Sequence, residues 1–207
     1  MTFDRPLDHV LGARPKVALL RLLLRTRGEH TGRSLAKRVD FDSKTCHAAL
    51  RDLARQGVVE HRRAGSSILY RVNERHVLVR ELLEPLFDRE GTFLSGYARE
   101  LRSRLRAPLV SLVLFGSVAR GEERPTSDVD LIVIVPDASA VPKAEEGVDQ
   151  AAADLAGRYG NPPQVIVLDR ETFGRKARTG DPLISEVLRT GRVLVGKSIA
   201  KVLKSVS

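Results

Sequence analysis

The chain reads LVSLVLFGSVARGEERPTSDVDLIVIV from Leu109 to Val135, and this stretch decides the fold of its second half. Two continuous apolar runs, 109–115 and 129–135, have the composition of strands that are covered on both faces. Between them stand a Gly-Ser pair, a short turn or helix and a polar loop. The order predicts two strands, with the polar groups gathered where the first strand ends and the second begins.

Two carboxylates open the second apolar run. Successive side chains alternate along a strand, so Asp128 and Asp130 point to one face while Val129 points to the other. Two carboxylates this close repel each other, and a divalent cation relieves the repulsion. Hard oxygen ligands suit Mg²⁺ or Mn²⁺. Asp128 and Asp130 are therefore the candidate metal-binding and catalytic residues.

A phosphate site is predicted at the Gly-Ser pair that follows the first run. Gly116 lets the backbone approach a ligand closely, and Ser117 offers a hydroxyl and an N–H at the start of a short helix, where phosphate is favoured. A phosphate cradle beside a metal-binding carboxylate pair is the apparatus for attack on a nucleoside triphosphate. The pattern therefore predicts a site for a nucleoside triphosphate and Mg²⁺.

This run resembles the polymerase-beta-type nucleotidyltransferase superfamily, whose signature is Gly-Ser, about ten residues and then Asp-x-Asp. Here residues 118–127 separate the two parts, and Ala119-Arg120-Gly121 and Ser127 also match the small nucleotidyltransferases of prokaryotes. The resemblance implies a nucleotide and a divalent cation as ligands. It implies nucleotide contacts at Gly116, Ser117, Arg120 and Ser127, and metal binding and catalysis at Asp128 and Asp130.

One position departs from the superfamily. Its members usually carry a third carboxylate on a later strand, and the matching position here is Gln164 in the apolar run 164–168. A glutamine side chain hydrogen-bonds but cannot serve as a base. Asp169 and Glu171 are the acidic residues that could substitute, with Asp169 the better candidate. The sequence therefore supports nucleotide binding more strongly than catalysis, because the glutamine at the position of the third carboxylate cannot act as a base.

The rest of the second half alternates between helix and strand patterns. The periodicity predicts helices over 144–158, 183–188 and 199–206, with an edge strand or turn over 191–195. The run from Gly191 to Ser198 matches G-x-x-x-x-G-K-S formally. A phosphate-binding loop of that type also needs a flexible cradle and a long following helix. The apolar run 192–195 offers neither, so we treat this match as chance.

The first half has the order of a winged helix-turn-helix. Helical spacing predicts helices over 16–27, 31–39 and 43–56, with Thr31 as an N-cap of the second. Two strand candidates, 58–62 and 68–72, follow around a Gly-Ser turn. Residues 14–75 resemble the winged-helix domains of small bacterial and archaeal transcriptional regulators.

The positive charge of the chain lies mainly in this half. Residues 1–75 hold 16 Lys and Arg against 8 Asp and Glu, whereas the whole chain carries a net charge of +9. A small basic domain predicts a polyanionic partner, most simply double-stranded DNA. The predicted contacts lie on the polar side of the third helix and on the wing: Ser43, Lys44, Thr45, His47, Arg51, Arg62 and Arg63.

The expected fold class is α/β (α+β), with an N-terminal winged helix-turn-helix (1–88) followed by a small mixed-sheet nucleotidyltransferase-like domain (89–207). Between them, the apolar face of Val77–Phe87 is a candidate contact for a homodimer. The one Cys and the lack of an apolar run of about 20 residues predict a cytoplasmic protein without a membrane segment.

The function expected from these features is a DNA-binding protein that binds a nucleoside triphosphate with Mg²⁺. If active, it would transfer a nucleotidyl group to an acceptor hydroxyl on a protein, a small molecule or a nucleic acid. The alternative is a transcriptional regulator whose second domain has lost catalysis and serves nucleotide sensing or assembly. In a third reading, the basic domain recruits RNA or a partner protein for the enzyme.

Overall fold

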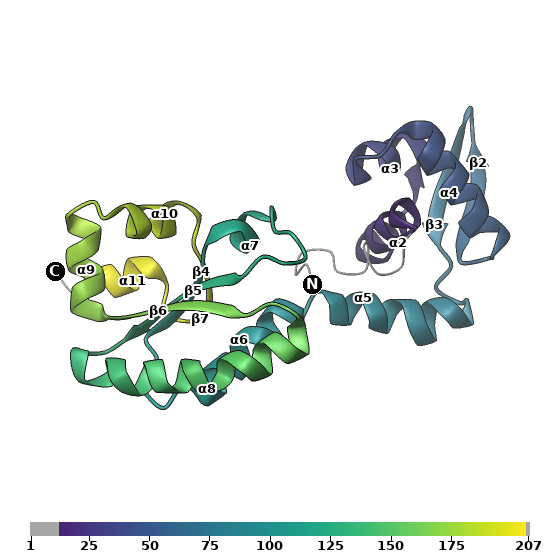
Figure 1. Ribbon diagram of the computed structural model, residues 1–207. Coiled ribbons are helices and arrows are strands. Elements are labelled where there is room, and N and C mark those ends of the chain that lie inside the picture. The colour runs from purple at the N-terminus through teal and green to yellow at the C-terminus, as the bar shows by residue number, and fades with distance from the viewer. Residues whose placement is uncertain (1–12, 206–207) are drawn as a thin grey trace. The chain divides into compact units, whose positions relative to one another are not determined.

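The computed structural model describes residues 13–205, which form two compact units that divide after Gly91 (Figure 1). The first unit contains α2 (Arg14–Thr26), β1 (His30–Thr31), α3 (Gly32–Val39), α4 (Ser43–Arg55), β2 (Val59–Ala64), β3 (Ser67–Val72), the π-helical turn η1 (Val79–Leu83) and α5 (Glu84–Glu90). The second contains α6 (Phe93–Arg104), β4 (Ser111–Leu114), α7 (Gly116–Arg120), β5 (Val129–Val135), the 3₁₀ turn η2 (Ala138–Ala140), α8 (Val141–Tyr159), β6 (Pro163–Asp169), α9 (Arg170–Arg178), α10 (Pro182–Thr190), β7 (Arg192–Gly196) and α11 (Ile199–Lys204).

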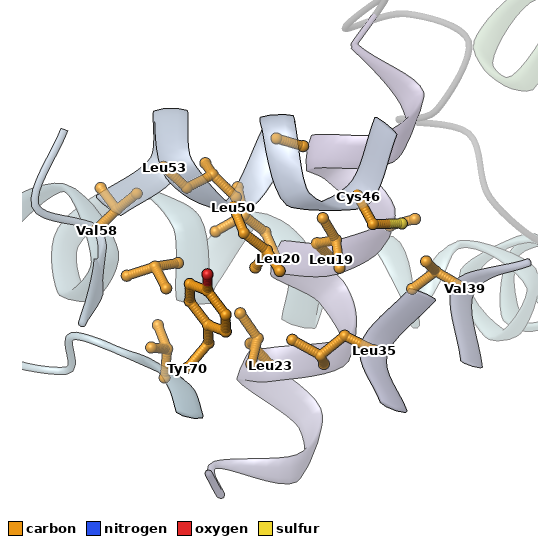
Figure 2. Close-up of a cluster of buried hydrophobic side chains, with 14 of the residues drawn as sticks. Leu19, Leu20, Leu23, Leu35, Val39, Cys46, Leu50, Leu53, Val58 and Tyr70 are labelled. Carbon is orange, nitrogen blue, oxygen red and sulfur yellow. The ribbon is translucent and has the colours of Figure 1, made fainter. Parts of the chain in front are cut away.

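The first unit is a winged helix-turn-helix, as predicted. Three helices pack around one aliphatic core, to which Leu19, Leu23, Leu35 and Leu50 contribute fully buried side chains (Figure 2). The side chain of Thr31 caps α3 by accepting a hydrogen bond from the backbone N–H of Ser34, again as predicted. The wing is an antiparallel sheet in the order β1-β3-β2. The two-residue strand β1 was not foreseen, because two residues carry no periodicity.

The segment after the wing packs its helix back onto this core. The side chains of Val79, Leu83 and Phe87 lie against the core, and Glu90 is buried in a two-point ion pair with Arg21. Pro85 lies in the first turn of α5, directly after η1, where its missing N–H is tolerated.

Only part of the apolar face predicted over Val77–Phe87 is exposed. Because Leu83 and Phe87 are used within the unit, the side chains left exposed are those of Leu78, Leu82 and Leu86, together with Val77. A homodimer contact remains a prediction, and these four exposed side chains are the ones available for it.

The second unit is built on a mixed four-stranded sheet in the order β6-β5-β4-β7. β5 and β6 are parallel, whereas β4 runs antiparallel to both β5 and β7. Helices α6 and α8 cover one face, where Leu112, Leu114, Leu131 and Val133 are buried (Figure 1). Helices α9, α10 and α11 cover the other face, on which Ile132 lies. The sheet is therefore covered on both faces, as the apolar runs predict.

One detail of the second unit differs from the prediction, and another confirms it. Helix α9 was not predicted, because its sequence RETFGRKAR carries five charges and buries only Phe173 and Gly174. The run 191–198 contributes β7, an edge strand paired with β4, so it is not a phosphate-binding loop. Across residues 13–205, no helix combines the length and the apolar composition that crossing a membrane would require.

Candidate active site and nucleic-acid surface

The Gly-Ser bend and the Asp130 carboxylate are in direct contact. The backbone N–H of Phe115 donates to the carbonyl of Asp130 at 3.0 Å, which holds the end of β4 beside the start of β5. Gly116 then turns the chain with φ +69°. A Cβ at this position would lie 2.1 Å from Oδ2 of Asp130, a distance that atoms cannot adopt. Glycine is therefore required here both by its backbone angle and by the carboxylate that fills the space.

Asp128 and Asp130 flank a buried Val129 at the entry to β5, which gives the two carboxylates one face of the strand. Asp128 is exposed and Asp130 is partly buried. Burial raises the pKa of Asp130, the negative charges of Asp128 and Glu186 raise it further, and Arg120 lowers it. Charging Asp130 therefore costs free energy in the folded protein, and a cation at this carboxylate would recover it.

Gln164 occupies the position opposite this pair. In the parallel ladder of β5 and β6, Asp130 is in register with Gln164, so the neighbouring strand presents a neutral amide beside the carboxylate, as predicted. Asp169 is in register with Val135 at the far end of β6, and its side chain caps α9 through the N–H of Thr172. The suggestion that Asp169 replaces the third carboxylate is therefore wrong, because five residues along the strand separate it from the site.

A third carboxylate does approach the site, from α10. Glu186 accepts a hydrogen bond at 2.6 Å from Nη1 of Arg120, which lies on α7, and Nε of Arg120 donates to Glu122 at 2.8 Å. The predicted nucleotide contact Arg120 thus lies beside the carboxylate pair and is held by two acidic partners. No local sequence pattern indicates Glu186, because it lies 56 positions after Asp130 and the packing of α10 brings it near.

The loop between α7 and β5 is fixed by its own polar groups. The Oγ of Ser127 accepts a hydrogen bond from the N–H of Arg124 at 2.8 Å, so this predicted nucleotide contact also closes a turn. The buried side chain of Asn161 donates to the carbonyl of Ser127 at 2.7 Å and to that of Pro125 at 3.2 Å. Asn161 therefore holds the backbone of the loop that leads into β5, a role that sequence reasoning missed.

The donor set at this site fits Mg²⁺ or Mn²⁺ together with a triphosphate. Within residues 13–205, no group of three or more His, Cys, Asp or Glu side chains is gathered closely enough to hold a metal ion by itself. Magnesium in phosphate-handling sites is typically bound by one or two carboxylates, with phosphate oxygens and water completing its six ligands. Asp128 and Asp130 supply two carboxylates, and Gly116 keeps the adjoining backbone free of a side chain.

The first unit presents a cationic surface on α4 and one face of the wing. Lys44 and Arg51 are exposed on α4, as is Arg55, which sequence reasoning missed. A groove of 430 Å³ runs between α4 and the wing, and its lining includes Arg51, Arg55 and Ile68. Arg63 is exposed and in register with Ile68, so it belongs to the face of the wing that borders this groove.

Arg62 lies on the opposite face of the wing, because side chains alternate along β2. Its Nε donates to Oε1 of Glu29 at 2.7 Å and its Nη2 donates to the other carboxylate oxygen. The hydrogen bond from Arg62 lowers the pKa of Glu29. Although Arg62 and Arg63 are neighbours in sequence, the structure does not bring them together.

Three further residues predicted to contact DNA make hydrogen bonds within α4. The side chain and backbone N–H of Thr45 bond to Asp42, the N-cap, and these bonds lower the pKa of Asp42. The ring of His47 bonds through Nδ1 to the carbonyl of Ser43 at 2.6 Å and to its hydroxyl at 3.2 Å. Thr45 and His47 are partly buried, whereas Ser43 is exposed at the start of the helix.

Comparison with known proteins agrees with the architecture of the second unit. Residues 94–182 match the family described as nucleotidyltransferase domain, and this part of the chain is a nucleotidyltransferase domain. Among solved structures, the chain is similar to a toxin–antitoxin crystallised with AMP-PNP, at 21% identity over 54% of this chain and 82% of that one, with a TM-score of 0.36. A mutant of the toxin–antitoxin MntA-HpeT gives 21% identity over 54% and 80%, with a TM-score of 0.34.

The archaeal chromatin protein TrmBL2 is similar over a longer part of the chain. The match covers 91% of this chain and 78% of that one, at 15% identity and a TM-score of 0.31. No curated protein matches the chain in sequence.

Proposed function

We propose that the second unit binds a nucleoside triphosphate with Mg²⁺ or Mn²⁺ and transfers its nucleotidyl group to an acceptor hydroxyl. The observation that carries this proposal is the contact of the Asp130 carboxylate with the Gly116 bend, where a Cβ would be 2.1 Å from Oδ2. A phosphate seated on this bend is within reach of a cation held by Asp128 and Asp130. The family match over 94–182 supports the same assignment.

Each residue has a distinct part in this proposal. Asp128 and Asp130 would hold the cation, and Gly116 would let phosphate oxygens approach the backbone N–H groups of the bend. Ser117 would donate its hydroxyl to the triphosphate, and Arg120 would donate to a phosphate with guanidinium N–H groups that Glu122 and Glu186 do not use. When bound, the cation supplies stabilisation of the negative charge that develops on the phosphates.

Nucleotide and metal together are expected to raise the melting temperature of the chain, because both bind only the folded second unit. A ligand at 100 times its Kd adds about 2.7 kcal/mol to the free energy of unfolding. Differential scanning fluorimetry with each nucleoside triphosphate, with and without Mg²⁺, measures the shift. Equal shifts with and without Mg²⁺ would contradict a metal site at the carboxylate pair.

The alternative of a nucleotide sensor without catalysis rests on the neutral Gln164 beside Asp130. Incubation with α-³²P-labelled ATP, GTP, CTP or UTP separates the two readings. An active enzyme retains label on the protein, on nucleic acid or on a small molecule, and releases pyrophosphate. A chain that binds nucleotide without transfer, and that gains transfer on Gln164→Asp, would establish the sensor reading.

We propose that the first unit binds double-stranded DNA through α4 and the wing. The exposed cations Lys44, Arg51, Arg55 and Arg63 support this, since they gather on the side of the unit where α4 and the wing meet. In a winged helix-turn-helix, this arrangement places α4 in the major groove and the wing along the phosphates. Ser43 and Lys44, at the start of α4, are the proposed base-contacting residues.

DNA affinity is expected to fall steeply with salt, by about 0.9 in log–log slope for each phosphate neutralised. Replacing Arg51 by Ala should reduce the magnitude of this log–log slope by about 0.9, the contribution of one phosphate contact. Arg71→Ala is the matched control, because Arg71 is also exposed but lies on the other face of the wing, paired with Glu60. Fluorescence anisotropy with duplex DNA, single-stranded RNA and unlabelled competitors measures both. An RNA preference, or equal effects of the two substitutions, would contradict the proposed surface.

A further inference from the structure

Transfer to a hydroxyl needs a group that removes the hydroxyl proton. The new bond forms between the acceptor oxygen and the α-phosphorus, so the proton on that oxygen must leave during the reaction. On the strand beside Asp130 the corresponding residue is Gln164, which cannot take up a proton. Asp128 and Asp130 are assigned to the cation. A base for this reaction must therefore come from another element.

Glu186 is a carboxylate that the fold brings to this face from another element, α10. The side chains of Ile184 and Val187 on α10 are buried against the sheet face formed by Val113, Phe115 and Ile132, which fixes the helix there. Glu186 lies between them in sequence and reaches Arg120 on α7 at 2.6 Å. Its side chain is 33% exposed, so a substrate hydroxyl can reach it. The influence of its charge on Asp130 agrees with this placement.

We propose that Glu186 is the catalytic base of the transfer, a role that rests on the function proposed above for this site. The acceptor hydroxyl gives its proton to the Glu186 carboxylate while its oxygen bonds to the α-phosphorus. The bond from the α-phosphorus to the bridging oxygen of the β-phosphate breaks, and its electron pair leaves with pyrophosphate. The proton thus ends on Glu186, the nucleotidyl phosphorus on the acceptor oxygen, and the electron pair on pyrophosphate.

Arg120 holds the Glu186 carboxylate in position before the substrate binds. Its Nη1 donates to Glu186 and its Nε to Glu122, which uses two of its five N–H donors. The ion pair fixes the position of the Glu186 carboxylate. A triphosphate that takes hydrogen bonds from Arg120 would compete with Glu186 for the same guanidinium group. Substrate binding would thus release the Glu186 carboxylate toward the acceptor hydroxyl.

The test compares Glu186→Gln with Glu122→Gln in the full-length chain. Both substitutions remove one negative charge that is hydrogen-bonded to Arg120, but Glu122 is 65% exposed and lies at the rim. Transfer from α-³²P-labelled nucleoside triphosphate should fall by about 100-fold or more for Glu186→Gln, the usual contribution of a general base. It should change by only a few-fold for Glu122→Gln. Formate should restore part of the rate of Glu186→Ala, since a small carboxylate can replace a missing base.

Mn²⁺ binding, followed by electron paramagnetic resonance, separates a base from a metal ligand. The Mn²⁺ affinity of Glu186→Gln is expected to stay within a few-fold of that of the unaltered chain. A tenfold loss of Mn²⁺ affinity would make Glu186 a metal ligand and overturn the proposal, as would transfer at the full rate by Glu186→Gln. If the proposed function itself is wrong, the unaltered chain will release no pyrophosphate. That result is distinct from an error in the role of Glu186.

Discussion

Replacing Asp130 by Asn is expected to abolish metal-dependent nucleotidyl transfer while making the chain more stable. The Asn side chain keeps the shape of Asp130 and removes its charge, so the cation loses a ligand and the triphosphate loses its counter-charge. Loss of such electrostatic stabilisation costs about 10³-fold in rate for a single donor, and a metal ligand is expected to cost at least as much. Release of pyrophosphate from α-³²P-labelled triphosphate in the presence of Mg²⁺ measures the loss.

The stability effect has the opposite sign. The pKa of Asp130 is raised above its value in the unfolded chain, first by burial and then by the charges of Asp128 and Glu186. An acid with a raised pKa favours the folded state at low pH and loses that contribution as the pH rises through its folded pKa. At neutral pH the charged Asp130 therefore destabilises the metal-free protein, and Asp130→Asn removes this cost.

A melting experiment at two pH values checks the sign. Without metal, Asp130→Asn should melt at a higher temperature than the unaltered chain at pH 7.5, because the variant lacks the partly buried charge that opposes folding. Below pH 4 the difference should disappear. Asp128→Asn serves as the control, because Asp128 is exposed and should affect transfer more than stability. A less stable Asp130→Asn variant at neutral pH would mean that Asp130 is a structural residue.

Features of the site that depend on neighbouring residues could be predicted from the sequence. The alternation of a strand fixes Asp128 and Asp130 on one face, and the apolar runs on either side predict that β4 and β5 are covered on both faces. The pairing of Gln164 with Asp130 follows from aligning two parallel apolar strands. Each of these conclusions needs only the period of a strand and its hydrophobic pattern.

Features that depend on distant packing could not be predicted. Glu186 reaches Arg120 because α10 folds over the sheet, and nothing near Glu186 in the sequence indicates that contact. Glu29 holds Arg62 across 33 positions, so a cation that appears free in the sequence is paired in the fold. The charged composition of α9 likewise concealed a helix that buries Phe173 against the sheet. Charge and periodicity predict which secondary structure a segment can form, whereas the tertiary fold determines which residues it contacts.

Replacing Gly116 by Ala is expected to disable the same site by steric means. Two costs add at this position. An L-residue in the left-handed region costs about 1–2 kcal/mol, and forcing a methyl group into an occupied space costs about 1–3 kcal/mol more. The Cβ would meet Oδ2 of Asp130 at 2.1 Å and Cγ at 2.9 Å, so the carboxylate must move away from the bend. Mn²⁺ binding should then be lost together with transfer.

Gly121 provides the matched control for this substitution. It has the same φ of +69° at the other end of α7, but a Cβ there would meet nothing within 4 Å. Gly121→Ala should therefore lower the free energy of unfolding only by the cost of the left-handed backbone angle. It should leave Mn²⁺ affinity unchanged. In an Asp130→Ala background, Gly116→Ala should cost about as little as Gly121→Ala, because the colliding Oδ2 and Cγ are gone and the nearest atom of residue 130 is its Cβ at 3.1 Å. Urea unfolding of the four variants measures this coupling. If Gly116→Ala were equally destabilising with and without the carboxylate, the contact between the bend and Asp130 would not be what makes glycine necessary there.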